Sequence, residues 1–523
     1  MPSAESWEGF VTSIAENAAS YFVDRHQEEG RGDKLAFREA GSGRTLSYKE
    51  LAEGTSLCAG ALRRSGLRAE ERVAMLVHDT LEFPQIFFGA LKAGIIPIPI
   101  NTLLSASVYD LILKDSRAVL LFVSEALLPM VRPLLEGNPY LRDVVVTGGD
   151  APAGTVTYAK FVAGSEPLET QPVSADEVAF WLYSSGSTGQ PKGVTHVHSS
   201  LRATADTYGA HVLKLTEDDT VFSAAKLFFA YGLGNGSTFP LAVGATAVLF
   251  AGRPTPQDML GTINAEKPTV FFGVPTLFAA MNAEMDQSGV PDAPLRMSVS
   301  AGEALPEDVG TRWQNHTGVP ILDGVGSTEM LHIFLSNAPG DVVYGTSGVP
   351  VPGYEMRLVD DAGAEVSLGD IGELVVNGAS AASSYWNQRH KSRATFQGEW
   401  TRTGDKYEQR DDGRYVYCGR TDDMFKVSGI WVSPFEVEQA LTSHPAVLEA
   451  AVIAKRDADG LDKPKAFIVL RGDEEPELAD VLKEHVKEKV GKWKYPRWID
   501  IVDDLPKTAT GKIQRFKLRE AEA

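Results

Sequence analysis

Cysteine is almost absent from this sequence, with only Cys58 and Cys418 among 523 residues. The two lie far apart and form no CxxC motif, which argues against a disulfide framework or a thiolate metal site. We interpret both as small buried apolar side chains, as expected of a protein in the reducing cytoplasm.

Long apolar runs are also missing. A bilayer-spanning helix needs about 20 consecutive apolar residues, and the most apolar stretch, 83–100, is interrupted by Pro84, Gln85 and Lys92. We therefore expect this stretch to form buried core. The N-terminal MPSAESWEGF has neither a basic segment nor an apolar one, so we expect no signal peptide. These absences predict a cytoplasmic protein without a membrane partner.

Basic residues are in deficit, with 50 Lys and Arg against 70 Asp and Glu, a formal net charge of -20. Such a balance argues against nucleic acid or an anionic membrane as partner. It leaves anionic small molecules possible, because a site can be locally basic.

The chain is too long for one ordinary core, so we expect at least two domains. Apolar runs bounded by Gly, Pro or Asp are typical of strands buried on both faces. With helical patterns between them, they predict an α/β fold whose large N-terminal domain contains mostly parallel sheets flanked by helices. These runs are RVAMLVH (72–78), AVLLFVS (118–124), DVVVTGG (143–149), TAVLF (246–250) and TVFFGVP (269–275).

The pattern changes near position 340. The segments 354–360 and 372–378 alternate polar and apolar residues, which predicts a small β subdomain. After GRTDD (419–423) come a helical pattern, two strand-like runs and a second helical pattern ending near Val490, which predict a mobile α+β C-terminal lid. We therefore expect an N-terminal acid- and ATP-binding domain over 1–421 and a lid domain over 422–523.

The segment YSSGSTGQPKGV (183–194) carries the strongest chemical signal. It follows an apolar run and precedes a helical pattern, so we expect a strand–loop–helix unit. Backbone N–H groups, hydroxyls and one ammonium in so short a loop suit an anion such as phosphate. The alternative, a flexible Gly/Ser linker, fits poorly with the PKG that the segment contains. The candidate phosphate contacts are Ser184, Ser185, Gly186, Ser187, Thr188, Gly189 and Lys192.

This loop resembles the phosphate-binding signature of the adenylate-forming superfamily: acyl-CoA synthetases, firefly-type luciferases and peptide-synthetase adenylation domains. Further segments resemble the superfamily's other motifs and occur in the same order. They are LSYKEL (46–51), LKAGIIPIPIN (91–101), GVGSTEM (324–330), GELVVNGASAASSYWN (372–387), WTRTGD (400–405), GRTDDMFKVSGIWVSPFEVE (419–438) and PKTATGKIQR (506–515). The resemblance implies activation of a carboxylate by ATP.

The resemblance also implies which residues bind ATP and the Mg²⁺ that accompanies it. Glu329 offers a hard oxygen ligand for the metal, and Thr188, Lys192 and Lys512 complete the catalytic set. Asp405 and Arg420 match the residues that bind the ribose and phosphate oxygens. The expected contacts to adenine and adenylate are Gly302, Glu303, Asp323, Gly324, Val325 and Thr328. Val325 stands where the family usually has an aromatic residue, so stacking on adenine is weaker or comes from elsewhere.

Two half-reactions follow from the resemblance. The carboxylate attacks the α-phosphorus of ATP, giving acyl-AMP and diphosphate, and a thiol of coenzyme A then displaces AMP. The family uses two lid orientations that pivot at the position of Asp422, and Lys512 acts in the first. The residues expected to line the coenzyme A tunnel in the second are Lys426, Ser428, Gly429 and Trp431.

The expected acyl pocket is short, flat and apolar, which suits a planar ring better than a fatty acyl chain. Its residues come from KLFFAYGLGN (226–235), SAGEAL (300–305) and GVGSTEMLHIF (324–334), and the first and last of these segments resemble benzoate–CoA ligases. His332 is either a packed histidine or a polar contact to the acid, so benzoate and 2-amino- or hydroxybenzoates such as anthranilate stay open. The pocket residues are Phe229, Ala230, Tyr231, Ala301, Gly326, His332 and Ile333.

Other members of the superfamily offer alternatives. The chain ends shortly after Lys512, which favours a stand-alone ligase over a peptide-synthetase domain, but an acyl carrier protein remains possible as acceptor in place of coenzyme A. A luciferase-type oxygenase fits poorly with Phe229 and Tyr231 in the pocket. A non-catalytic nucleotide sensor fits poorly with the presence of Lys192, Glu329 and Lys512.

Overall fold

The computed structural model describes residues 13–185, 191–427, 430–458, 460–472, 477–507 and 513–522. The chain divides into two compact units. The first comprises Met1–Tyr344, Gly348–Glu355 and Asn377–Thr401, and the second comprises Gly345–Ser347, Met356–Val376 and Arg402–Ala523. The small β subdomain thus groups with the C-terminal part of the chain, whereas the expected boundary after residue 421 stays a prediction.

One sheet of the first unit is parallel throughout and has the strand order β4-β3-β5-β6-β7. Three of its strands confirm the predictions at 72–78, 118–124 and 143–149, and all five residues of β5 are buried. Burial on both faces explains why these segments are apolar without alternation. The strands are β3 (Arg72–Leu76), β4 (Ile96–Pro99), β5 (Leu120–Ser124), β6 (Asp143–Thr147) and β7 (Val156–Thr157).

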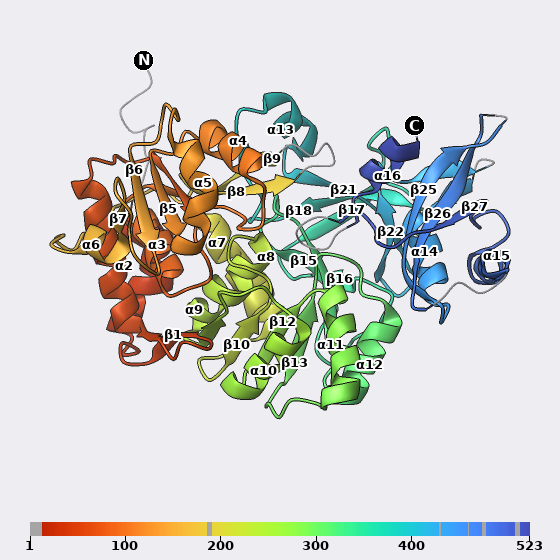
Figure 1. The fold of residues 1–523 in the computed structure, drawn as a ribbon, viewed down its shortest axis with the longest axis horizontal. Coiled ribbons are helices and arrows are strands. Elements are labelled where there is room, and N and C mark those ends of the chain that lie inside the picture. The colour runs from red at the N-terminus through yellow and green to blue at the C-terminus, as the bar shows by residue number, and fades with distance from the viewer. Residues whose placement is uncertain are drawn as a thin grey trace, which may run out of the picture. The chain divides into compact units, whose positions relative to one another are not determined.

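A second sheet of this unit has the order β16-β15-β14-β13-β12-β10-β11-β1-β2, parallel from β14 to β1 and antiparallel at its edges. Strands β11 and β12 confirm the predictions at 246–250 and 269–275. Figure 1 shows helices over the face of β12 and β13. The strands are β1 (Leu35–Glu39), β2 (Thr45–Ser47), β10 (Thr220–Ser223), β11 (Thr246–Leu249), β12 (Val270–Gly273), β13 (Met297–Ser300), β14 (Ile321–Gly326), β15 (Ile333–Ser336) and β16 (Val349–Pro350).

Helices between the strands cover both sheets. The N-terminus of α2 has a capping box, in which Ser47 and Glu50 each accept the other's backbone N–H. The apolar stretch 83–100 forms most of α3 and all of β4 and is buried core, as predicted. The main helices are α2 (Tyr48–Arg64), α3 (Glu82–Lys92), α4 (Ala106–Ser116), α5 (Leu128–Leu135), α7 (His198–Thr204), α8 (Ala230–Leu233), α9 (Phe239–Val243), α10 (Pro256–Glu266), α11 (Pro275–Ser288), α12 (Glu307–Thr317) and α13 (Arg389–Thr395).

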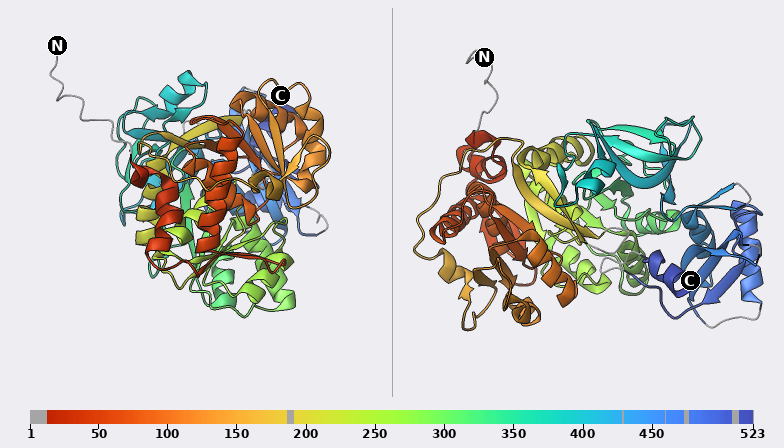
Figure 2. Two further views of the ribbon diagram at one scale, coloured as in Figure 1. Left: turned by 90° about the vertical axis from the view of Figure 1, so that its left-hand side faces the viewer. Right: turned by 90° about the horizontal axis from the view of Figure 1, so that it is seen from above.

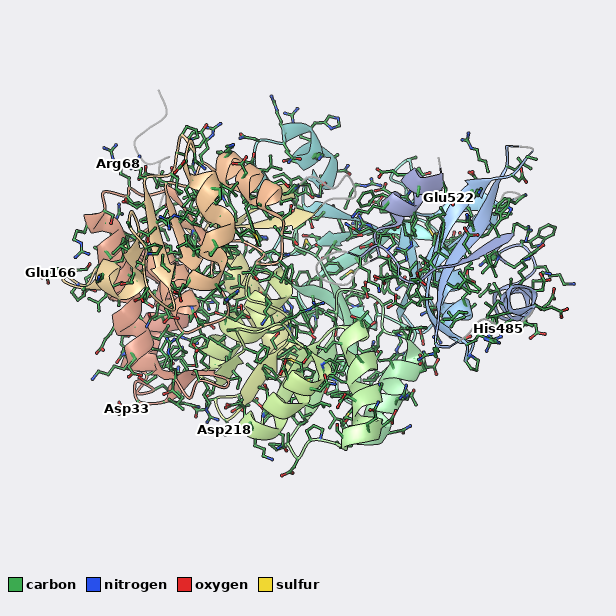
Figure 3. The ribbon with its side chains drawn as sticks, in the orientation of Figure 1. Asp33, Arg68, Glu166, Asp218, His485 and Glu522 are labelled. Atoms are coloured by element: carbon green, nitrogen blue, oxygen red, sulfur yellow. The ribbon has the colours of Figure 1, made fainter. Side chains whose placement is uncertain are left out.

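The second unit is built mostly from antiparallel strand pairs and helices, and β27 pairs in parallel with β26. The predicted helix after residue 432, the two strands and the helix ending at Val490 are all present, as α14, β25, β26 and α15. Its last helix is anchored by Glu522, labelled in Figure 3, whose carboxylate accepts from Lys455 and Lys465 at 2.7 Å each. The elements are β17 (Glu355–Val359), β18 (Gly372–Asn377), β21 (Trp400–Gln409), β22 (Tyr415–Arg420), β23 (Phe425–Val427), β24 (Ile430–Val432), α14 (Pro434–Thr442), β25 (Val447–Arg456), β26 (Asp462–Leu470), α15 (Leu478–Val490), β27 (Trp498–Ile501) and α16 (Arg515–Glu522).

The cysteines and the helices bear on two expectations from the sequence, that both cysteines are buried and that no helix spans a membrane. Cys58 and Cys418 are both free and buried, as predicted. Over the described residues, no helix combines the length and apolarity needed to cross a bilayer.

Candidate active site

Two paired strands flank the predicted phosphate loop. Strand β8 (Val178–Ser185) pairs antiparallel with β9 (Pro191–Val197), and Ser184 lies opposite Lys192. The right-hand view of Figure 2 shows the two strands side by side in yellow. The predicted strand–loop–helix arrangement is therefore wrong, because residues 191–197, with the β-branched Val194, Thr195 and Val197, form a strand and α7 begins only at His198. The predicted residues Gly186, Ser187, Thr188 and Gly189 lie outside the described residues, and Ser185 ends β8.

Lys192, at the start of β9, faces a carboxylate and a phenol. Its Nζ lies 3.5 Å from Oε1 of Glu329 and 3.3 Å from the hydroxyl of Tyr385, and 4.4 Å from the centre of the Tyr385 ring. The Tyr385 hydroxyl donates to Oε1 of Glu329 at 2.7 Å. Two predicted residues 137 positions apart are thus brought together by a third that the sequence did not single out.

The backbone around Glu329 is held from two sides. His196 on β9 contacts the carbonyl of Thr328 at 2.8 Å, and the carbonyl of Glu329 accepts the N–H of Ala382 at 2.7 Å. Burial lowers the pKa of His196 to about 4, so the imidazole is neutral and its Nε2–H donates to the carbonyl. These contacts fix the Thr-Glu pair relative to the paired strands β8 and β9.

The predicted adenylate contacts lie at the carboxyl ends of β13 and β14. These neighbouring parallel strands place Ser300 opposite Asp323, so Ala301–Glu303, which follow β13, and Asp323–Gly326, which form the last part of β14, lie at the same edge of the parallel sheet. Such an edge is where parallel α/β sheets bind ligands. Gly302 has a φ of +100°, which disfavours any side chain there. The carboxyl of Asp323 is buried and accepts the N–H of Leu305, and burial raises its pKa well above the ordinary value.

Tyr231, Gly326 and Ile333 of the predicted acyl pocket lie next to His332. Phe229 caps α8, which begins with Ala230 and Tyr231. The Tyr231 hydroxyl donates to the carbonyl of Val299, two residues before Ala301, and the Tyr231 carbonyl lies 3.2 Å from Nε2 of His332. Gly326 pairs with Ile333 across β14 and β15, and a Cβ on Gly326 would lie 2.4 Å from the carbonyl oxygen of His332. The contacts connect the segments 226–235 and 324–334 and reach Val299 on β13, directly before the segment 300–305.

His332 itself is buried, and its Nε2 also lies 3.1 Å from Oδ1 of Asn235. Because both neighbours of Nε2 are oxygen acceptors, this nitrogen carries the proton. Burial lowers the pKa of His332 to about 3, so the ring is neutral. Among the residues that the structure describes, Nδ1 has no hydrogen-bond partner.

The predicted ribose-binding pair lies in the second unit. Asp405 on β21 and Arg420 on β22 are opposite each other in the antiparallel register, with Oδ1 and Nη1 3.0 Å apart. The Asp405 carboxylate raises the pKa of Arg420 above its ordinary value. Gly404 has a φ of +72°, and a Cβ there would lie 2.9 Å from Nη2 of Arg420. A glycine is therefore needed for this pair to form.

The other predicted lid residues are only partly described. Asp422 lies just after β22, Lys426 is exposed on β23 and Trp431 lies on β24. Ser428, Gly429 and Lys512 lie outside the described residues.

The chain matches the AMP-binding enzyme family over residues 24–386 and the AMP-binding enzyme C-terminal domain over residues 436–512. The chain belongs to the AMP-binding enzyme family.

This AMP-binding enzyme is 55% identical over 513 residues to a 4-hydroxybenzoate–CoA/benzoate–CoA ligase of Rhodopseudomonas palustris (strain ATCC BAA-98 / CGA009), covering 96% of this chain and 94% of the relative. It is 56% identical over 512 residues to a benzoate–CoA ligase of Thauera aromatica, and the match covers 97% of this chain and 96% of the relative. It also matches the crystal structure of an anthranilate CoA ligase in complex with anthranoyl-AMP, with a TM-score of 0.92 and 42% identity. The match covers 98% of this chain and 99% of that chain. The predicted resemblance is confirmed.

Three residues of this AMP-binding enzyme contact the predicted site but were missed in the sequence. Tyr385 lies inside a motif that the sequence did reveal, GELVVNGASAASSYWN, and His196 follows the phosphate loop by a few residues. Asn235 ends the segment KLFFAYGLGN. Proximity to a recognised motif was the available signal, but which side chain points inward depends on the fold.

Proposed function

We propose that this protein is an AMP-forming aryl-CoA ligase. It converts a benzoate-type acid, either benzoate or a 2-amino- or hydroxybenzoate such as anthranilate, with ATP and coenzyme A into the aryl-CoA, AMP and diphosphate. The observation that carries this proposal is the 55% identity to a 4-hydroxybenzoate–CoA/benzoate–CoA ligase over 96% of the chain.

In the first half-reaction a carboxylate oxygen of the acid attacks the α-phosphorus of ATP, and the bond to diphosphate breaks. Lys192 and the loop residues Ser184–Gly189 bind the phosphates, and Lys512 offsets the negative charge that develops at the reacting centre. Asp405 and Arg420 bind the ribose, while Gly302, Glu303 and 323–325 flank the adenine. Thr188 and Thr328 contribute hydroxyls beside the phosphates.

Glu329 is the proposed protein ligand of the metal. Its carboxylate is a hard oxygen donor, as Mg²⁺ prefers, and 17% of the side chain is exposed. The residues therefore fit the ion. When bound, Mg²⁺ neutralises phosphate charge and polarises the reacting phosphoryl group. The protein's own part is to hold the Glu329 carboxylate in place through Tyr385 and the backbone contact at Ala382.

In the second half-reaction the thiol sulfur of coenzyme A attacks the acyl carbon, the bond to the AMP oxygen breaks and the thiol proton is released. The proposed lid, residues 422–523, turns about Asp422 between the two steps. Lys426, Ser428, Gly429 and Trp431 then line the path of the pantetheine arm.

The proposed acyl pocket combines an aromatic side with small residues. Tyr231 and Phe229 supply the rings, and Ala230, Ala301 and Gly326 leave room for a planar acid. His332 and Ile333 close the pocket. Support for this arrangement comes from the contacts that join Tyr231, His332 and β13.

The test is product analysis by mass spectrometry with ATP, Mg²⁺, coenzyme A and a panel of benzoate, anthranilate, hydroxybenzoates, cinnamates and fatty acids. Aryl-CoA and AMP in equal amounts from a benzoate-type acid are the expected result. AMP without a thioester of coenzyme A would indicate an acyl carrier protein as the acceptor. Absence of AMP with every acid would overturn the proposal.

A further inference from the structure

Tyr385 contacts both charged side chains of the proposed adenylation site, Lys192 and Glu329. It lies on β19 (Ser384–Tyr385), which pairs antiparallel with β9, so Tyr385 is opposite Val194, two residues after Lys192. The residue is 4% exposed, and its ring lies 5.2 Å from that of Phe396. Its backbone N–H donates to the hydroxyl of Ser392 at 3.0 Å. The position of its side chain is therefore fixed by packing and by the backbone.

The protons of this cluster can be assigned from chemistry alone. The Lys192 ammonium has only donors, and the Glu329 carboxylate has only acceptors. The Tyr385 hydroxyl has one proton, so that proton goes to Oε1 of Glu329 at 2.7 Å and the phenol oxygen accepts from Lys192 at 3.3 Å. The phenol thus gives each charge a partner other than the opposite charge.

The alternative partner is important because Lys192 Nζ and Glu329 Oε1 are already within ion-pair distance, 3.5 Å apart. Their side chains are only 16% and 17% exposed, so water screens the attraction weakly. The proposed function needs the two charges apart, one on phosphate oxygens and the other on the metal. A direct ion pair between them would compete with both of these contacts.

We propose that Tyr385 is a positioning residue of the adenylation half-reaction, which keeps the Glu329 carboxylate available to Mg²⁺ and the Lys192 ammonium available to phosphate. The inference rests on the proposed function. The Tyr385 hydroxyl orients Glu329, and the face of the Tyr385 ring attracts the Lys192 ammonium at 4.4 Å. The neighbouring contacts of Ala382 with the Glu329 carbonyl and of Ser380 with the Met330 carbonyl, both 2.7 Å, bring the same chain segment to the Thr-Glu loop.

The test uses Tyr385→Phe, which retains the ring and loses only the hydroxyl. Loss of a hydrogen bond to a metal-binding group typically costs about 10–100-fold in metal affinity or activity. We expect a rise of about tenfold or more in the Mg²⁺ concentration that gives half-maximal ATP–diphosphate exchange, with the KM for benzoate unchanged. Calorimetric titration provides a readout besides activity: ATP with Mg²⁺ binds more weakly to the variant than to the wild type, and ATP with EDTA, whose binding depends on Lys192 but not on the metal, loses less affinity.

Tyr344→Phe is the matched control. Its hydroxyl makes three hydrogen bonds in the first unit, with the N–H of Ile321 at 3.3 Å, the carbonyl of Gly310 at 3.2 Å and Oε1 of Gln314 at 3.4 Å, away from Glu329. We expect it to leave the Mg²⁺ dependence unchanged. If Tyr385→Phe has the Mg²⁺ dependence and ATP binding of the wild type, Tyr385 only packs and the inference is overturned. If the wild type itself supports no exchange with any aromatic acid, the proposed function fails, and the calorimetric comparison still decides whether Tyr385 affects binding of ATP with Mg²⁺.

Discussion

The carboxylate of Asp79 accepts the backbone N–H of Leu227, with both carboxylate oxygens 3.3 Å from the nitrogen. Asp79 is 4% exposed, and burial raises its pKa to about 6. The neighbouring Lys226 is partly buried, and it donates to the carbonyl of Phe250. Because Phe229 caps α8 two residues later, this contact anchors the segment that leads into α8, where residues of the proposed acyl pocket lie.

Asp79→Ala is expected to lower the free energy of unfolding by about 1–3 kcal/mol, because the buried N–H of Leu227 loses its acceptor. We also expect the KM for the aromatic acid to rise while the KM for ATP stays the same. Asp79→Asn retains an acceptor oxygen and should have the smaller effect in both measurements. Thermal unfolding and steady-state kinetics of the two variants check this, and equal effects of Ala and Asn would contradict it.

His332 gives a prediction about ring substituents. Its Nε2–H is engaged by Asn235 and Tyr231, which leaves Nδ1 as an acceptor. An amino or hydroxyl substituent on the acid supplies a donor, whereas benzoate does not. His332→Leu should therefore lower kcat/KM for anthranilate more than for benzoate, by up to about tenfold in the ratio. Competition between the two acids measures this ratio directly, and equal losses would mean that the imidazole only packs.

Four buried histidines predict acid sensitivity. Burial lowers the pKa of His26 and His332 to about 3 and of His196 and His198 to about 4, against an ordinary value of 6.5. Below pH 6.5 the unfolded state therefore binds more protons than the folded state. Their contribution to stability is full above pH 6.5 and is lost as the pH falls towards 3–4. Asp79 has the opposite effect on the free energy of unfolding. Its pKa is raised to about 6, so below that pH the folded state binds more protons at this carboxyl than the unfolded state.

Each histidine contributes a slope of up to about 1.4 kcal/mol per pH unit to the free energy of unfolding in that range. Thermal or urea unfolding between neutral pH and the acid limit measures the summed slope. His198→Asn retains an acceptor for the N–H of Ala18, which Nδ1 now accepts at 3.2 Å. The variant should reduce the slope by the equivalent of one proton. A slope identical to that of the wild type would mean that His198 does not contribute to the acid sensitivity.

Asp405 and Arg420 give a prediction about ATP. Asp405→Asn weakens the charge-assisted bond to Arg420 and the proposed bonds to ribose, so we expect the KM for ATP to rise about tenfold. The KM for the acid should stay the same. Glu373→Gln is the matched control, because it weakens another carboxylate–arginine pair of the second unit, with Arg402. This control should reduce thermal stability and leave the KM for ATP unchanged; a rise equal to that of Asp405→Asn would contradict the assignment.

The buried parallel strands could be predicted from the sequence because burial on both faces leaves an unbroken apolar run, as in 120–124 and 270–273. Strand β9 after the phosphate loop was missed because PKGVTHV is short and does not alternate: residues 193–196 are all buried. The contact of Tyr385 with Glu329 joins residues 56 positions apart. No periodicity encodes such a pair, since it depends on the pairing of β19 with β9. The individual site assignments and the residue 421 boundary stay predictions.

The order of strands in the nine-stranded sheet has a consequence for biosynthesis. Strand β1 pairs in parallel with β11, so Glu39 is matched with Leu249, 210 residues later (249 − 39). At about 5–20 residues per second, roughly 10–40 s of translation separate the two strands. During that time the nascent chain exposes β1, whose Ala36 and Phe37 are buried in the folded protein and whose other neighbour, β2, is a short edge strand. Chaperones that shield unpaired strands on the ribosome are therefore expected to raise the yield of this enzyme, most strongly when translation of the first 250 residues is slow.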